Sequence, residues 1–97
     1  MRGVREDSPA SDAVDAARER WPRTDDAWEA VKWSLARDPE DQTRPLNEAG
    51  NMRVFTSEGA RSIGWPTIVV RFEFDARYVT IRDARFSDAR AIQAGRA

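Results

Sequence analysis

The chain contains neither cysteine nor histidine among its 97 residues. Without cysteine it forms no disulfides and offers no thiolate nucleophile, and without either residue type it lacks the ligand sets that zinc and iron prefer. Imidazole, the usual acid–base group near neutral pH, is also missing. Any catalysis would use Arg, Asp, Glu, Tyr, Ser, Thr or the single lysine, Lys32, and we expect no metal and no cofactor.

Long apolar runs are also missing. No stretch approaches the roughly 20 apolar residues needed to span a bilayer, and the N-terminal "MRGVREDSPA" lacks the apolar block of a signal peptide. These absences predict a cytoplasmic protein that does not bind membranes. A chain of 97 residues also predicts a single domain over residues 1–97 with one hydrophobic core.

A strong charge of one sign is absent as well, because the net charge is −1. This near-neutral balance argues against strong non-specific binding of nucleic acid, which depends on neutralising phosphates. The charge is nevertheless uneven. Residues 1–50 hold 8 basic and 12 acidic side chains, whereas residues 51–97 hold 8 basic and 5 acidic ones. The excess positive charge therefore lies in the second half.

Two amphipathic patterns in the first half predict helices at about residues 9–21 and 25–37. Ser8 and Thr24 are the predicted N-caps, and Pro22 ends the first helix. The short connection between the helices predicts an antiparallel helical hairpin.

Trp33 lies about 140° around the second predicted helix from Trp28, so it cannot share the apolar stripe of Trp28, Val31 and Leu35. It either packs on a second surface of the domain or contacts a partner. We prefer the first interpretation, because burial on two sides is common for a helix that lies in a cleft.

The second half predicts a polar connecting loop at residues 39–51, then strands at about 51–57, 67–75 and 78–86. Period-2 alternation is clearest in the second of these strands. A short strand at residues 3–6 is a further candidate, and residues 88–97 are compatible with a terminal helix. The order predicts an α+β fold, in which an N-terminal antiparallel helical hairpin packs on a small antiparallel sheet of three to four strands.

A four-residue turn between Phe74 and Val79 best fits the last two strands, and it places Phe72 opposite Ile81. The same register opposes Arg71 and Arg82, a destabilising like-charge pair unless a carboxylate or a bound anion lies nearby.

The register also places Val70 opposite Asp83, which a core would not accept. A bulge at Arg82 and Asp83 would remove this conflict, turning Ala84 and Phe86 inward and Arg85 outward. For each strand arginine, the preferred interpretation is a solvated residue paired with a nearby carboxylate. A metal site built from Glu73, Asp75, Asp83 and Asp88 is the least favoured alternative.

Three motifs suggest a family resemblance: "DSPA" before the first helix, "LARDP" at the end of the second, and "PTIVVRFEFDARYVTIRDARF" near the end of the chain. Together they resemble the RelE/ParE superfamily of bacterial type II toxins over nearly the whole chain. The resemblance implies a helical hairpin on an antiparallel sheet and a cognate antitoxin as partner. It also implies growth inhibition, through mRNA cleavage on the ribosome or through DNA gyrase.

The same resemblance implies a set of site residues. Arg85 matches the arginine of the family's final strand, and Phe86 stands where many members have His or Tyr. Arg61 and Arg85 are the candidate catalytic residues, and the candidates for binding RNA or another anion are Arg53, Arg71 and Arg82. The only tyrosine, Tyr78, lies at the hairpin turn, which favours gyrase as target or a decayed active site.

A protein-interaction module without catalysis, built on the same fold, is the alternative function. Its candidate contacts are Trp33 and Trp65, since large aromatic side chains often anchor interfaces. The two functions predict different surfaces. An enzyme should gather its arginines on one concave face, whereas a binding module should disperse them and expose an apolar patch.

Overall fold

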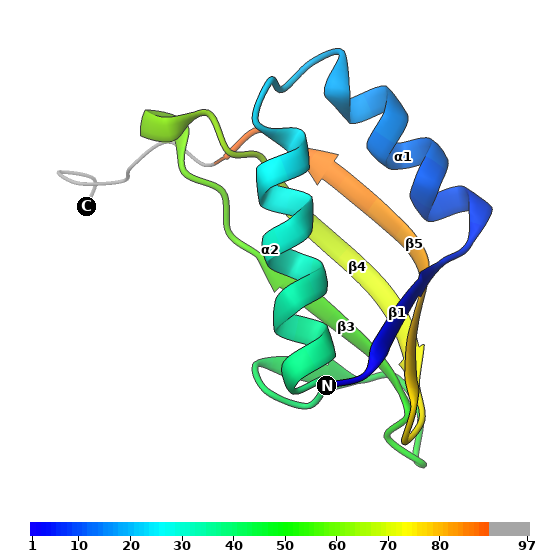
Figure 1. The fold of residues 1–97 in the computed structure, drawn as a ribbon. Helices are drawn as coiled ribbons and strands as arrows, with labels where there is room; N and C mark the ends of the chain where they lie inside the picture. The colour runs from blue at the N-terminus through cyan, green and yellow to red at the C-terminus, as the bar shows by residue number, and fades with distance from the viewer. Residues whose placement is uncertain (90–97) are drawn as a thin grey trace, which may run out of the picture.

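The computed structural model describes residues 1–89. Two helices and five strands form an α+β fold (Figure 1). The elements in chain order are β1 (Gly3–Glu6), α1 (Ser8–Arg18), α2 (Thr24–Arg37), β2 (Thr43–Pro45), β3 (Met52–Ser57), the short 3₁₀ helix η1 (Arg61–Ile63), β4 (Thr67–Phe74) and β5 (Tyr78–Ser87). From residue 90 onward, the predicted terminal helix lies outside the described residues.

The sheet has the strand order β1-β5-β4-β3-β2. Its pairs are antiparallel except for β1 and β5, which run parallel. The predicted antiparallel sheet of three to four strands is therefore wrong in two respects, because the sheet is mixed and has five strands. β2 lies within the predicted loop. The candidate strand at residues 3–6 is confirmed as β1, so the two helices follow a strand instead of opening the chain.

Both helices cover the same face of the sheet (Figure 1), and the core lies between them and the strands. The alternation predicted for β4 is confirmed, since Ile68, Val70 and Phe72 are fully buried. The other buried core residues are Ala10, Val14, Ala27, Trp28, Val31, Leu35, Val79 and Ile81. Neither helix within residues 1–89 has the length and apolar content that crossing a membrane requires.

The helix ends differ from the prediction for packing reasons. α1 ends at Arg18, and Trp21 leaves the helix to stack against Phe86, with ring centroids 6.4 Å apart. Thr24 is the first residue of α2 rather than its N-cap. Its buried hydroxyl donates to the Trp21 carbonyl at 2.6 Å, which fixes the turn between the helices. Ser8 likewise lies inside α1, and no side chain caps that helix.

The β4–β5 hairpin has the predicted register, with Phe74 opposite Val79 and Phe72 opposite Ile81. The register shifts at the predicted bulge, so that Arg71 pairs with Asp83 and Arg82 is the extra residue. The predicted opposition of Arg71 and Arg82 is therefore wrong.

The parity change that the bulge was predicted to cause is confirmed beyond Arg82. Ala84 and Phe86 pack against the core, while Arg85 is exposed. The second part of β5 therefore presents apolar side chains to the helices and a guanidinium to the opposite side.

Candidate binding surface

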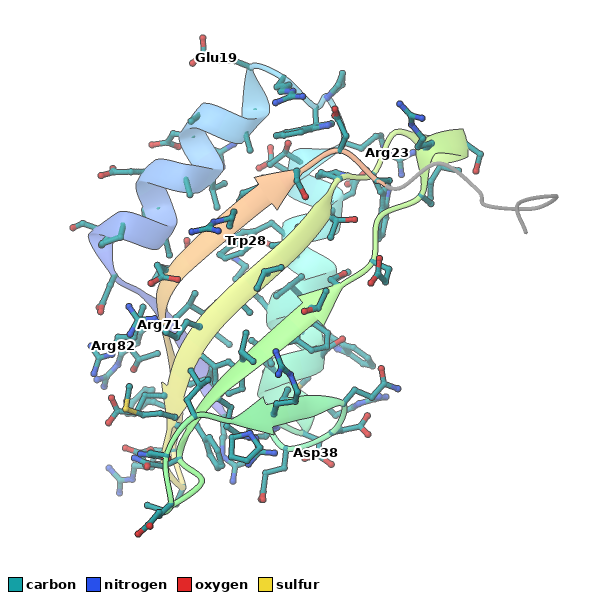
Figure 2. The ribbon with its side chains drawn as sticks, turned by 180° about the vertical axis from the view of Figure 1, so that it is seen from behind. Glu19, Arg23, Trp28, Asp38, Arg71 and Arg82 are labelled. Carbon is teal, nitrogen blue, oxygen red and sulfur yellow. The ribbon has the colours of Figure 1, made fainter. Side chains whose placement is uncertain are left out.

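Arg71 and Arg82 lie on the face of the sheet opposite the helices (Figure 2), and each is paired with carboxylates. Arg71 Nη2 lies 2.6 Å from Asp83 Oδ2. Arg82 spans two elements, with Nη1 2.8 Å from Asp7 Oδ2 and Nη2 2.8 Å from Glu73 Oε1. Hydrogen bonds to Glu73 and Asp7 raise the pKa of the Arg82 guanidinium. Both charges are balanced within the fold, so neither residue is an open anion site.

Arg53 is held by the loop that it supports. Its Nε donates to Thr43 Oγ1 at 2.6 Å, Nη2 donates to the Thr43 carbonyl at 3.1 Å, and Nη1 donates to the Gly50 carbonyl at 3.1 Å. These bonds tie β2 to β3, which explains how a strand of only three residues pairs stably. Arg53 therefore has a structural role here.

The two candidate catalytic residues, Arg61 and Arg85, line different hollows. Arg61 is exposed on η1 and borders a hollow of about 150 Å³ that it shares with Trp21 and Trp65. Arg85 borders another hollow, beside α1. Within residues 1–89, Arg85 forms no ion pair. Arg71, Arg82 and Arg85 lie on the adjacent strands β4 and β5, whereas Arg53 lies on β3 and Arg61 on η1. The two candidate catalytic arginines line separate hollows and do not converge on one site.

The carboxylates of the least favoured metal site have other partners. Glu73, Asp83 and Asp88 each pair with an arginine. Asp75 accepts hydrogen bonds from the backbone amides of Arg77 and Tyr78, both at 2.8 Å, and these bonds lower the pKa of its carboxyl. Within residues 1–89, the acidic side chains form no group of three or more suited to a metal ion.

The two candidate contact tryptophans differ in exposure. Trp65 is half-buried and packs against the core, and its Nε1 is buried without a hydrogen-bond partner among residues 1–89. Trp33 is 53% exposed, so the interpretation that it packs on a second surface of the domain is wrong. The Arg37 guanidinium covers part of its ring, 4.4 Å from the centroid. Of these two tryptophans, Trp33 offers the larger exposed apolar surface.

A groove between α1 and β5, not predicted from the sequence, has a volume of about 370 Å³. We call it the α1–β5 groove. Its α1 side comes from a second stripe of the helix, since Ala13, Ala16, Ala17 and Arg20 follow the i, i+3, i+4, i+7 spacing. The remaining lining residues are Trp21, Ala84, Arg85 and Phe86. The run of alanines in α1 was the available signal, because small side chains leave room for another chain, and Ala16 among them is exposed.

The end of the groove is fixed by a polar cluster. Trp21 Nε1 donates to Asp88 Oδ1 at 3.0 Å, and Arg20 Nη2 lies 2.8 Å from Asp88 Oδ2. The Arg20 guanidinium also lies over the Trp21 ring, 4.6 Å from its centroid. These contacts hold Trp21 as a wall of the groove. Of the two arginines that border the groove, Arg20 is paired with Asp88, whereas Arg85 forms no ion pair within residues 1–89.

Comparison with known proteins adds no family assignment. Neither the known protein families, nor the curated proteins, nor the solved structures contain a match to this chain.

Proposed function

We propose that this chain is a RelE/ParE-like domain that acts by binding other proteins and has no ribonuclease centre. The observation that carries the proposal is the state of the candidate anion-binding arginines. Arg53, Arg71 and Arg82 are all bound to groups of the fold itself. The two remaining candidates, Arg61 and Arg85, line separate hollows, and this separation favours a binding module over an enzyme.

The chemistry of the remaining candidates also supports this proposal. Arg61 and Arg85 can stabilise negative charge, but a guanidinium stays protonated and is a poor general base. Proton transfer from a ribose hydroxyl would need another group within reach. The carboxylates Glu73 and Asp83 are already paired with arginines. Tyr78 is the first residue of β5, beside the hairpin turn, at the opposite end of the strand from Arg85.

An RNA-cleavage assay tests the absence of a nuclease centre. The purified chain is incubated with programmed ribosomes and a labelled mRNA, beside a nuclease toxin as positive control. We expect no cleavage products from this chain. Cleavage that disappears in the Arg61→Ala/Arg85→Ala double variant would contradict the proposal and support catalysis by these two residues.

A selection experiment tests protein binding without assuming where it occurs. The folded chain is immobilised and panned against a phage-displayed library of random peptides. We expect enrichment of related sequences that compete with one another for the folded chain but do not bind the heat-unfolded chain. If no family of peptides emerges after repeated rounds, the protein-binding function is wrong.

A second candidate function is a growth-inhibiting toxin that acts on a protein target such as DNA gyrase and is neutralised by a cognate antitoxin. The element order favours it, because the two helices are followed by the antiparallel strands β3–β5, and the resemblance implies a helical hairpin on such a sheet. Tightly controlled induction in a bacterial host tests it. This candidate predicts growth arrest without new mRNA ends, and normal growth with soluble chain would contradict it.

A further inference from the structure

β5 is paired along only part of its outer edge. β1 pairs with residues 78–81, and the last bond of this contact runs from the Asp7 amide to the Ile81 carbonyl at 2.9 Å. The chain then enters α1 at Ser8 and moves away from the sheet. Within residues 1–89, no strand pairs with the outer edge of residues 83–87. We call this segment the open β5 edge.

The open β5 edge keeps the geometry of a regular strand. The bulge at Arg82 ends before it, and residues 83–87 resume unbroken antiparallel pairing with β4. Five residues at about 3.4 Å each give an edge about 17 Å long, which can accept a short added strand. Such edges bind extended peptides through main-chain hydrogen bonds, while alternating side chains set the specificity.

The α1–β5 groove lies beside this edge on the helix side. On the helix side of the sheet, Ala84 and Phe86 border it, and Trp21 closes one end. Ala13 and Ala16 are too small to cover the strand, so α1 leaves the groove open. A side chain that points from an added strand towards the helices would enter this apolar space.

Arg85 defines what the middle of an added strand should carry. Its side chain is exposed, lies between Ala84 and Phe86 in sequence, and forms no ion pair within residues 1–89. Residues of an added strand alternate between the two faces, so a residue beside Arg85 lies between two residues that point into the groove. A carboxylate at that position would be paired across the strands.

From this arrangement we propose that the open β5 edge and the α1–β5 groove bind an extended segment of a partner protein as an added strand. The segment carries an acidic residue between two apolar residues. The proposal rests on the protein-binding function above and specifies its site and ligand chemistry. A second copy of this chain is a poorer ligand for the site. If two copies paired their open β5 edges around a two-fold axis at Arg85, the two Arg85 side chains would lie opposite each other and repel.

Two synthetic peptides test the proposal, with the central sequence threonine–valine–glutamate–valine–threonine or the same sequence with lysine in place of glutamate. Each is titrated into the isotope-labelled chain to about 1 mM, and amide chemical shifts are recorded. We expect saturable shifts confined to residues 83–87 and the facing residues of α1. The glutamate peptide should bind about tenfold more tightly than the lysine peptide.

Variants separate this site from others. Arg85→Glu should reverse the preference, so that the lysine peptide binds more tightly. Ala16→Trp should fill the groove and abolish binding, and the exposed position of Ala16 allows this change without disturbing the core. Arg77→Glu, at the exposed hairpin turn, changes the charge equally and should leave binding unchanged.

The outcomes distinguish the site from the function. No shifts at the edge with either peptide, equal affinities for both, or an unchanged preference in Arg85→Glu would each overturn the site proposal. Self-association that grows with protein concentration and broadens the amide signals of the same residues would show that a second copy of this chain occupies the site. That result would also overturn the site proposal. Peptides from the random library that bind near Trp33 would leave the protein-binding function intact and refute only this site.

Discussion

The two halves of β5 share one strand but have different neighbours. Residues 78–81 lie between β1 and β4, and Val79 and Ile81 are fully buried. Among the described residues 1–89, residues 83–87 pair with β4 on one side only, and their inward side chains, Ala84 and Phe86, are partly exposed. The bulged residue, Arg82, separates the halves. The comparison indicates that the first half stabilises the fold, and the second half is the part that we propose for binding.

The largest effect should come from residues 78–81, the closed half of β5, which pairs with a strand on both sides. Ile81→Ala removes a fully buried side chain and leaves a cavity between the sheet and the helices. We expect it to lower the free energy of unfolding by about 2–5 kcal/mol. Urea unfolding followed by tryptophan fluorescence measures this loss. A loss below about 1 kcal/mol would show that the closed half is not part of the core.

The next effect concerns the boundary between the halves. Arg82→Met keeps most of the side-chain volume but removes the ion pairs to Asp7 and Glu73. We expect a lower melting temperature, and the difference from the parent should shrink as salt screens the pairs. Arg85→Met is the matched control, since Arg85 has no ion pair within residues 1–89. Equal effects of both variants would contradict a special role for Arg82.

A smaller, pH-dependent effect is expected at the turn that joins β4 to the closed half. Hydrogen bonds from the amides of Arg77 and Tyr78 hold the pKa of Asp75 below its ordinary value. Their stabilisation is present well above the pKa of an unfolded aspartate, about 3.9, and disappears as the pH falls through the lower pKa of the folded chain. Asp75→Ala should therefore lower the melting temperature at pH 7 but not at strongly acidic pH.

Glu58→Ala is the control for this experiment, because Glu58 is an exposed loop residue with no ion pair within residues 1–89. Its melting temperature should follow the parent at every pH. An Asp75→Ala difference that stays constant on acidification would contradict a role for the ionised carboxyl.

The smallest effect should come from the other exposed apolar feature. Trp33→Ser removes a side chain that is 53% exposed and contacts Arg37. We expect the free energy of unfolding to change by less than about 0.5 kcal/mol. Thermal unfolding measures this, and Trp28→Ser, at a buried core position, is the contrasting control. A large loss in Trp33→Ser would show that its exposed ring supports the fold.

Local patterns were sufficient to predict much of the hairpin. The alternation along β4 gave its buried face, and the conflict between Val70 and Asp83 gave the bulge. The opposition of Arg71 and Arg82 was wrong because the same bulge moves Arg82 out of register. Arg82 instead pairs with Glu73 and Asp7. Asp7 is 75 residues away in the chain, and no local spacing indicates such a contact.

Other features depend on tertiary contacts that the sequence pattern does not reveal. β2 forms in a polar segment because Arg53 binds it from the neighbouring strand. The parallel position of β1 depends on the sheet that forms later in the chain. The groove exists because β1 stops short of the second half of β5, which only the assembled sheet shows.

The most direct test of the difference between the two halves is amide hydrogen exchange along β5, with and without the glutamate peptide. Without peptide, we expect slow exchange across residues 78–81 and fast exchange of the outward-pointing amides in residues 83–87. Added peptide should slow exchange in the second half alone. Full protection of both halves in the free chain, or no change on adding peptide, would contradict the account of an open binding edge.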